Sequence, residues 1–184
     1  MFLRLPRFRR LKRAIKRVGL AFVAHFDPGS VIWELKSTDK FDAIREVISC
    51  ARTFSELRGL DLGAFAEKVV ERERLQSTGF GRGVAVAHGR TDQVSAPRIA
   101  LGVSRTGIDF DAVDGKPVQL LFIVANHPDR EVDYLHILST LACMVRNEIF
   151  RRELLTCDHE SDARRKLCEV FADLLRRNRL RYAS

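Results

Sequence analysis

One short segment restricts the fold more than any other part of the chain. Residues 118–125 read Val-Gln-Leu-Leu-Phe-Ile-Val-Ala, so all but one of the side chains are apolar. A continuous apolar run of this length is typical of a strand that is buried on both faces. A sheet with such a strand needs helices on both sides. We therefore expect an α+β fold with three layers (α/β/α), in which helices flank a small mixed β-sheet.

The rest of the chain supplies elements that suit this arrangement. Alternating β-rich residues predict strands, and apolar side chains at helical spacing predict helices. Asp39, Asp61 and Ser161 stand where each would cap the N-terminus of a helix. The expected order is β-α-α-β-β-β-α-α-α, comprising strand 31–35, helices 39–48 and 61–74, strands 84–87, 98–103 and 118–125, and helices 133–147, 149–155 and 161–175.

Two of the connecting segments and one helix face are also predicted. Residues 77–83 are expected to form a glycine-rich loop, and residues 107–117 hold turn residues. The helix over 133–147 is expected to bury a stripe of apolar side chains, namely Leu135, Leu138, Leu141, Ala142 and Val145.

Charge is concentrated at the two ends of the chain. The net charge is +8, and residues 1–19 hold eight basic residues and no acidic one. Apolar residues recur at helical spacing among these cations, which predicts a basic amphipathic helix within residues 1–26. Such a helix suits weak contact with an anionic surface, or docking on the rest of the protein. We divide the chain into a basic extension (1–29), a folded domain (30–175) and a basic tail (176–184).

Composition argues against several classes of protein. No run of 18 apolar residues is present, so no transmembrane helix is expected. Between the two ends acidic residues outnumber basic ones, so specific nucleic-acid binding is not expected. The four cysteines form no Cys-x-x-Cys pair, which predicts thiols in a reducing cytoplasm. We expect a cytoplasmic protein that can attach peripherally to a membrane through its basic extension.

Several short motifs resemble nucleotide-binding or metal-binding motifs, but the residues and elements around them do not fit such sites. A helix precedes Gly79-x-Gly81-x-Gly83 and a strand follows it, which is the reverse of a Rossmann loop. The only Gly-Lys pair is followed by Pro117, so there is no Walker loop. The acids of residues 109–114 have the wrong spacing for a calcium loop. Cys157 and His159 lack two further zinc ligands. We expect no metal site.

His88 has the context of a reactive side chain. It follows the short apolar strand 84–87 and precedes Gly89 and Arg90. A neutral imidazole is a good nucleophile toward phosphorus near neutral pH, and the phosphoryl group it carries needs cationic and amide donors. Arg72, Arg82 and Arg90 are near it in sequence. On spacing alone, a polar histidine at a strand end without a chemical role is the more common interpretation.

A longer pattern surrounds His88. Residues 72–90 contain Arg-Glu, then Ser-Thr-Gly-x-Gly-x-Gly, then a short strand that ends in His-Gly. This arrangement resembles the signature of the fructose/mannitol-type EIIA domains of the bacterial phosphoenolpyruvate-dependent phosphotransferase system. Residues 108–122 resemble a segment of nitrogen-type EIIA proteins, the regulatory branch of that family. Residues 134–142 resemble the helix that carries the family's second histidine. The resemblance covers about residues 30–175.

The resemblance implies a phosphocarrier with a small mixed sheet between helices. In the family, the histidine of Pro-His-Gly takes a phosphoryl group from phosphorylated HPr, and that histidine is His88 here. Arg72 matches the arginine of the Arg-Glu pair and would help to hold the phosphate, together with the amides around Gly89. Arg90 is a further candidate. This chemistry requires no metal or organic cofactor.

The sequence departs from the family pattern at two positions. Ala87 replaces the proline before the histidine, and Tyr134 stands where the family has its second active-site histidine. The Tyr134 hydroxyl could donate to a phosphate oxygen, but it cannot supply a charged imidazole. His136, two residues later, is a position where nitrogen-type members can carry histidine. Positions two apart do not share a helix face, so Tyr134 and His136 cannot both point at His88.

Three functions follow from these observations. The first is a nitrogen-type phosphocarrier that regulates an unidentified protein partner through its phosphorylation state. The second, suggested by Ala87 and Tyr134, is an EIIA-like binding module with poor phosphotransfer. The third is a sugar-specific EIIA that donates to a separate EIIB, and the nitrogen-like segment 110–122 argues against it.

Overall fold

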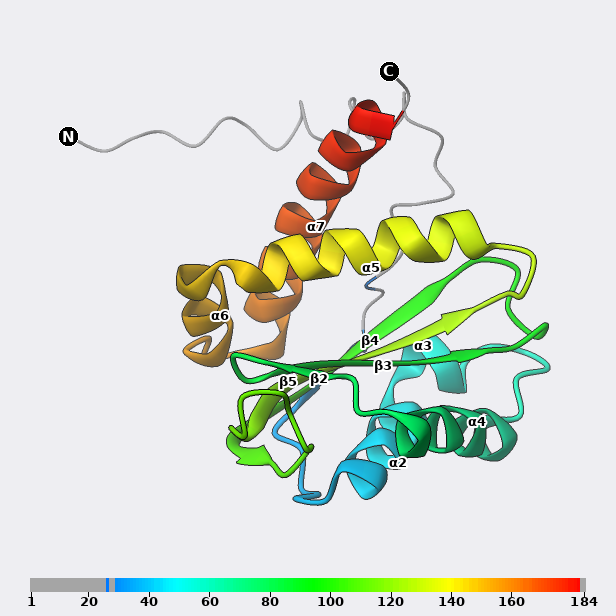
Figure 1. The fold of residues 1–184 in the computed structure, drawn as a ribbon, viewed down its shortest axis with the longest axis horizontal. Helices are drawn as coiled ribbons and strands as arrows, with labels where there is room; N and C mark the ends of the chain where they lie inside the picture. The colour runs from blue at the N-terminus through cyan, green and yellow to red at the C-terminus, as the bar shows by residue number, and fades with distance from the viewer. Residues whose placement is uncertain (1–25, 27–28, 183–184) are drawn as a thin grey trace.

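The computed structural model describes residue 26 and residues 29–182 (Figure 1). The basic amphipathic helix expected within residues 1–26 lies, apart from residue 26, outside the described part. Among the described residues, no helix is both long enough and apolar enough to cross a membrane.

A mixed sheet of five strands forms the middle of the domain. Its strand order is β1-β4-β5-β3-β2. The strands are β1 (Val31–Trp33), β2 (Gly79–Gly81), β3 (Val84–Arg90), β4 (Arg98–Ile108) and β5 (Val118–Asn126). β1 runs parallel to β4 and β3 parallel to β5, whereas β4–β5 and β2–β3 are antiparallel pairs. The apolar run therefore forms the central strand, as its composition predicts.

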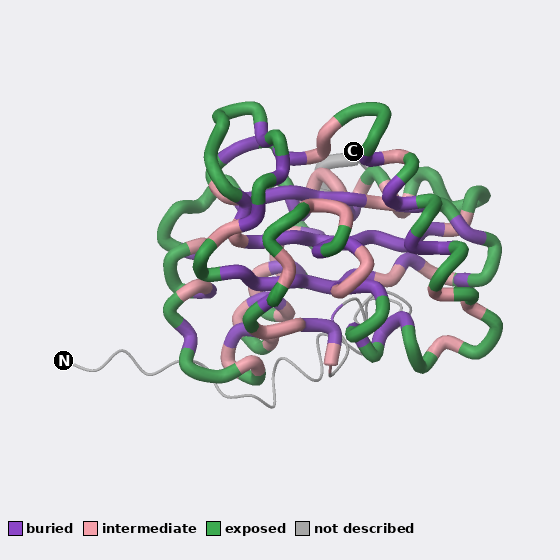
Figure 2. The backbone as a smooth tube through the Cα atoms, turned by 90° about the horizontal axis from the view of Figure 1, so that it is seen from below, coloured by how far each residue is buried: buried purple, intermediate pink, exposed green. Residues whose placement is uncertain are grey.

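Helices cover both faces of this sheet, which confirms the expected three-layer fold. The helices on one face are α2 (Lys40–Cys50), α3 (Arg52–Ser55) and α4 (Leu62–Leu75), and those on the other are α5 (Glu131–Arg146), α6 (Glu148–Leu155) and α7 (Glu160–Tyr182) (Figure 1). Figure 2 shows the strands as long buried runs between exposed loops.

β5 contributes to both of the hydrophobic cores that result. Leu121 and Ile123 pack in the core beneath α2, α3 and α4. Phe122 and Val124 pack in the core beneath α5, α6 and α7. Successive side chains of a strand point to opposite faces of a sheet, so one apolar run serves both layers.

Two of the three predicted helix caps are confirmed. The Asp39 carboxylate accepts hydrogen bonds from the backbone N–H groups of Phe41 and Asp42. The Asp61 carboxylate accepts one from Ala64 at 3.0 Å. Ser161 is not a cap, because α7 begins at Glu160 and Ser161 is already inside the helix. The helix also continues to Tyr182, past the expected end near residue 175.

Other differences concern the edges of elements. The segment 77–83, expected as a loop, contains the short strand β2, which pairs with β3. β3 and β4 extend further than their apolar cores, to Arg90 and Ile108. The single-turn helix α3 was not expected. β2 pairs with β3, the next strand along the chain, and α3 is a single turn closed by hydrogen bonds within residues 51–56. Elements this short carry little propensity signal of their own.

The buried stripe of α5 also differs from the expected one. Leu135 is 57% exposed and Ala142 is exposed, whereas Ile137, Leu141, Met144 and Val145 are buried. Ile137 lies two residues after Leu135, which is about 200° around a helix. The apolar side chain of Leu135 therefore faces solvent next to Tyr134.

We predict that a methyl group at Gly102 destabilises the fold. Gly102 lies in β4, and a Cβ atom there would be 2.5 Å from Val47 Cγ2 and 2.6 Å from Leu35 Cδ1. Gly102→Ala should lower the free energy of unfolding, measured by urea denaturation, by about 1–3 kcal/mol because the core is overpacked.

Gly63→Ala is the matched control. Gly63 is exposed in the first turn of α4, and the nearest atom to a Cβ would be 3.5 Å away. This substitution should leave the free energy of unfolding unchanged or raise it by up to about 1 kcal/mol. Equal effects of the two substitutions would contradict the packing described for Gly102.

Candidate functional site

His88 lies near the end of β3, on the face of the sheet covered by α5. It is opposite Val124 in the parallel pairing with β5. The half-buried imidazole ring is 5.3 Å from the ring of Tyr134, measured between centroids, with the ring planes at 50°. The structure thus brings together two residues that the sequence analysis connected only through a family resemblance.

The protonation of the His88 ring follows from its contact with the backbone. Nδ1 lies 3.4 Å from the carbonyl oxygen of Val86. A carbonyl oxygen only accepts hydrogen bonds, so Nδ1 carries the proton in this contact. In the neutral ring Nε2 then holds the free lone pair. Nε2 is therefore the ring nitrogen of His88 whose lone pair is free to act as a nucleophile.

The surroundings of His88 favour the neutral ring. Burial lowers the pKa of the imidazole below its ordinary value, and the positive charges of Arg72 and Arg90 lower it further. The hydrogen bond to Val86 acts in the opposite direction but is outweighed. A neutral ring with a free Nε2 is the form of histidine that attacks an electrophile.

Tyr134 lies half-buried beside His88 and keeps its proton. Burial raises the pKa of its phenol to about 12, although the charges of Arg72 and Arg90 oppose this rise. Near neutral pH the hydroxyl is therefore a hydrogen-bond donor.

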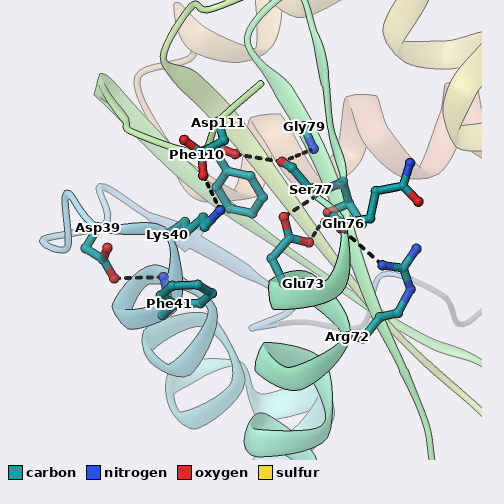
Figure 3. A network of polar contacts seen from close by, with 11 residues as sticks. Asp39, Lys40, Phe41, Arg72, Glu73, Gln76, Ser77, Gly79, Phe110 and Asp111 are labelled. Carbon is teal, nitrogen blue, oxygen red and sulfur yellow. Dashed lines mark hydrogen bonds and ion pairs between the residues drawn. The ribbon is translucent and has the colours of Figure 1, made fainter. Parts of the chain in front are cut away.

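The two arginines reach the site from different elements. Arg72 comes from α4, and its Nη1 donates to the backbone oxygen of Gln76 at 3.1 Å (Figure 3). Arg90 is the last residue of β3, and its Nη2 donates to Glu131 at the start of α5, at 3.2 Å. Each guanidinium carries five N–H donors, so both retain donors for an anion.

Gly89 permits the close approach of α4 to β3. Its side of the strand faces away from His88, and a Cβ atom there would lie 2.8 Å from Val69 Cγ2 and 3.0 Å from Phe65 Cε2. Only glycine fits this position without displacing α4. The absence of a side chain thus helps to keep Arg72, on the same helix, near the end of β3.

Glu73 is a supporting residue that the sequence analysis missed. Its side chain is buried, and its carboxylate accepts hydrogen bonds from the backbone N–H and the hydroxyl of Thr78, at 2.8 and 2.6 Å (Figure 3). The Thr78 carbonyl in turn accepts from the N–H of Val86, the residue that contacts His88. Glu73 lies three residues after Val70 and four after Val69, both of which were expected to face inward. This spacing would have placed Glu73 on the buried face of α4.

The other candidates take different positions. Arg82 lies in the turn before β3, and the four residues of extended strand from Val84 to His88 alone span about 13 Å. The structure therefore does not bring Arg82 to the site. His136 lies on α5 two residues after Tyr134, in a different direction around the helix. In the described part of the chain, no group of three or more His, Cys, Asp and Glu side chains could hold a metal ion.

Comparison with known proteins gives a family match over most of the chain. The family model described as "Phosphoenolpyruvate-dependent sugar phosphotransferase system, EIIA 2" matches residues 24–169. The "PTS system fructose-specific EIIA component" of Haloferax volcanii is 38% identical over 110 residues, which are 60% of this chain and 71% of that protein.

Two further relatives match over smaller shares of their own length. The "Nitrogen regulatory protein" of Pseudomonas aeruginosa is 38% identical over 90 residues, which are 49% of this chain and 58% of that protein. The "PTS system fructose-specific EIIABC component" of Bacillus subtilis is 32% identical over 126 residues, which are 68% of this chain and 20% of that protein.

Solved structures share the fold. The nitrogen regulatory protein IIA-Ntr of Neisseria meningitidis superposes with a TM-score of 0.71 at 29% identity, over 79% of this chain and 97% of that one. The mannitol IIA of Escherichia coli superposes with a TM-score of 0.63 at 16% identity, over 78% of this chain and 96% of that one. The fold, the match over residues 24–169 and the relatives lead to one conclusion: this chain belongs to the EIIA 2 family of the phosphoenolpyruvate-dependent sugar phosphotransferase system.

Proposed function

We propose that this protein is a phosphocarrier that accepts a phosphoryl group on Nε2 of His88 from the phosphohistidine of an HPr-type protein. The observation that carries the proposal is the neutral imidazole, with Nδ1 on the Val86 carbonyl and with Arg72, Arg90 and Tyr134 around it. Membership of the EIIA 2 family supports the same chemistry.

The transfer needs no group beyond those at the site. The lone pair of Nε2 attacks the phosphorus, and the P–N bond of the donor breaks with its electrons remaining on the donor nitrogen. The two arginines then balance the charge of the phosphoryl oxygens, and the Tyr134 hydroxyl donates one hydrogen bond. The Val86 carbonyl stabilises the positive charge that develops on the ring at Nδ1. Catalysis here is positioning and charge stabilisation.

Exposed apolar side chains near the site suit a protein as the donor. Leu135 follows Tyr134 on α5, and Val132 lies three residues before Leu135 on the same helix face; they are 57% and 67% exposed. Leu75, at the end of the helix that carries Arg72, is 83% exposed. Apolar side chains beside a charged centre are typical of the core of a protein interface.

We further propose that the phosphorylation state of His88 regulates a protein partner. Similarity to nitrogen regulatory proteins supports this role, and similarity to fructose-specific components leaves sugar-specific transfer to an EIIB as the alternative. Tyr134 favours a second candidate, an EIIA-like binding module with slow transfer, because a phenol cannot become a cation. The basic extension would add salt-sensitive contact with anionic surfaces.

The first prediction from this site concerns phosphorylation itself. In a mixture of phosphoenolpyruvate, enzyme I, HPr and this protein, intact mass should rise by one phosphoryl group. His88→Ala should show no gain. His159→Ala, which removes an exposed histidine immediately before α7, should gain the group at the unchanged rate. No gain by the unaltered protein with its authentic HPr would favour the binding module.

The second prediction concerns pH. Because burial and two arginines lower the pKa of His88, its ring stays neutral as pH falls through the ordinary histidine value of about 6.5. The rate of phosphoryl acceptance should therefore stay level at that pH and fall only in more acidic solution. An NMR titration of the His88 ring checks the cause directly, and an apparent pKa at or above about 6.5 contradicts it.

The third prediction concerns Tyr134. Tyr134→His supplies a ring that can take up a proton when the phosphoryl group arrives, so transfer should become about tenfold faster. Tyr134→Phe removes the hydroxyl and should slow transfer by about threefold to tenfold. Single-turnover phosphorylation by phospho-HPr measures both rates. Identical rates for all three proteins would show that this side chain does not contact the transferred group.

A further inference from the structure

A second cluster of arginines lies away from His88. A cavity of about 180 Å³ opens between α6, the turn from β2 to β3 and the start of β5. Arg82 lines it from the turn, and Arg151 and Arg152 line it from α6. Figure 1 shows α6 beside this end of the sheet. Segments distant in sequence therefore bring three arginines to the lining of one small cavity.

The cavity has a surplus of positive charge. Glu148 is its one acidic lining residue, and this carboxylate pairs with Arg152 at 2.7 Å. Arg151 is partly buried and donates one N–H to the carbonyl of Val145, so most of its donors remain available. Gln119 also lines the cavity and directs its Nε2 to the Arg105 carbonyl. Three arginines against one glutamate leave a net positive site.

The backbone holds Arg82 in an unusual conformation at this cavity. Gly81, Arg82 and Gly83 all have positive φ, of 91°, 59° and 75°. Arginine is disfavoured in this region, whereas glycine or asparagine would adopt it at little cost. The Arg82 N–H donates to the Asp114 carboxylate at 2.8 Å, which fixes the turn. The chain thus keeps a long cationic side chain at a position where a smaller residue would be easier to fold.

We propose that this cavity binds a small phosphate-bearing anion, either inorganic phosphate or the phosphoryl end of a small phosphomonoester. Guanidinium groups match phosphate oxygens with paired N–H donors. The volume is below the range of about 300–1,000 Å³ typical of pockets for larger ligands, so a small anion suits it.

The cavity is separate from the phosphoryl acceptor site. Gly83 lines the cavity immediately before β3, whereas His88 lies near the other end of that strand. The four residues of extended strand from Val84 to His88 alone span about 13 Å. Binding at the cavity therefore does not require His88, and loss of phosphoryl transfer would leave it intact.

The test is an NMR titration of the full ¹⁵N-labelled chain with inorganic phosphate, at an ionic strength held constant with chloride. The amides of residues 82–83, 119–120 and 148–152 should shift together and saturate with one dissociation constant. Glycerol phosphate in a second titration shows whether the cavity takes free phosphate or a monoester, according to which binds more tightly.

Four variants make the result specific. Arg82→Gln and Arg152→Gln should each weaken phosphate binding by about tenfold, since each removes charge-assisted donors. Arg58→Gln, which removes an exposed arginine beside α3, and His88→Ala should leave it unchanged. Dispersed spectra check that each variant is folded. No saturable shift at these amides, shifts confined to the surroundings of His88, or equal weakening by Arg58→Gln would overturn the proposal.

Discussion

The burial of β5 on both faces is the constraint on which the rest of the structure depends. Its side chains enter the core beneath α4 on one face and the core beneath α5 on the other. This places β3, the neighbour of β5, between the same two helices. Arg72 then reaches the end of β3 from one layer, and Tyr134 reaches it from the other. The candidate site is thus a product of the three-layer packing.

The local parts of this fold could be predicted from the sequence. The apolar run of β5 and the caps at Asp39 and Asp61 depend on residues that are close in the chain, and the structure confirms them. β2 and the exposed Leu135 could not be predicted. The Gly-Phe-Gly segment of β2 has little strand propensity of its own and becomes a strand only by pairing with β3, and packing against the rest of the fold decides which face of α5 is buried. The prediction that Ser161 caps the last helix was wrong because several polar residues lie near the start of that helix and any of them could form its boundary.

The candidate site, too, could be predicted only in part from the sequence. Composition and spacing drew attention to His88 and offered three nearby arginines without choosing among them, and the family resemblance then selected Arg72 and added Tyr134. The buried carboxylate of Glu73 went unnoticed because its partner, Thr78, lies in a segment expected as a loop. Arg82 seemed a local candidate by sequence distance, yet β3 is extended and carries it to the far end. Sequence proximity is a poor guide along a strand.

The parallel pairing of β3 with β5 has a consequence for how the site comes into existence. Parallel neighbours cannot be joined by a tight turn, and β4 lies between β3 and β5 in the chain. Residues 84–90 therefore cannot pair until residues 120–126 are present. Closing such loops costs entropy before any contact repays it. During synthesis His88 is therefore made well before β5, which pairs with its strand, and before α5, which supplies Tyr134 and helps to bury the imidazole ring. In a nascent chain the candidate site is not assembled until the C-terminal third, which contains α5 and Tyr134, has folded.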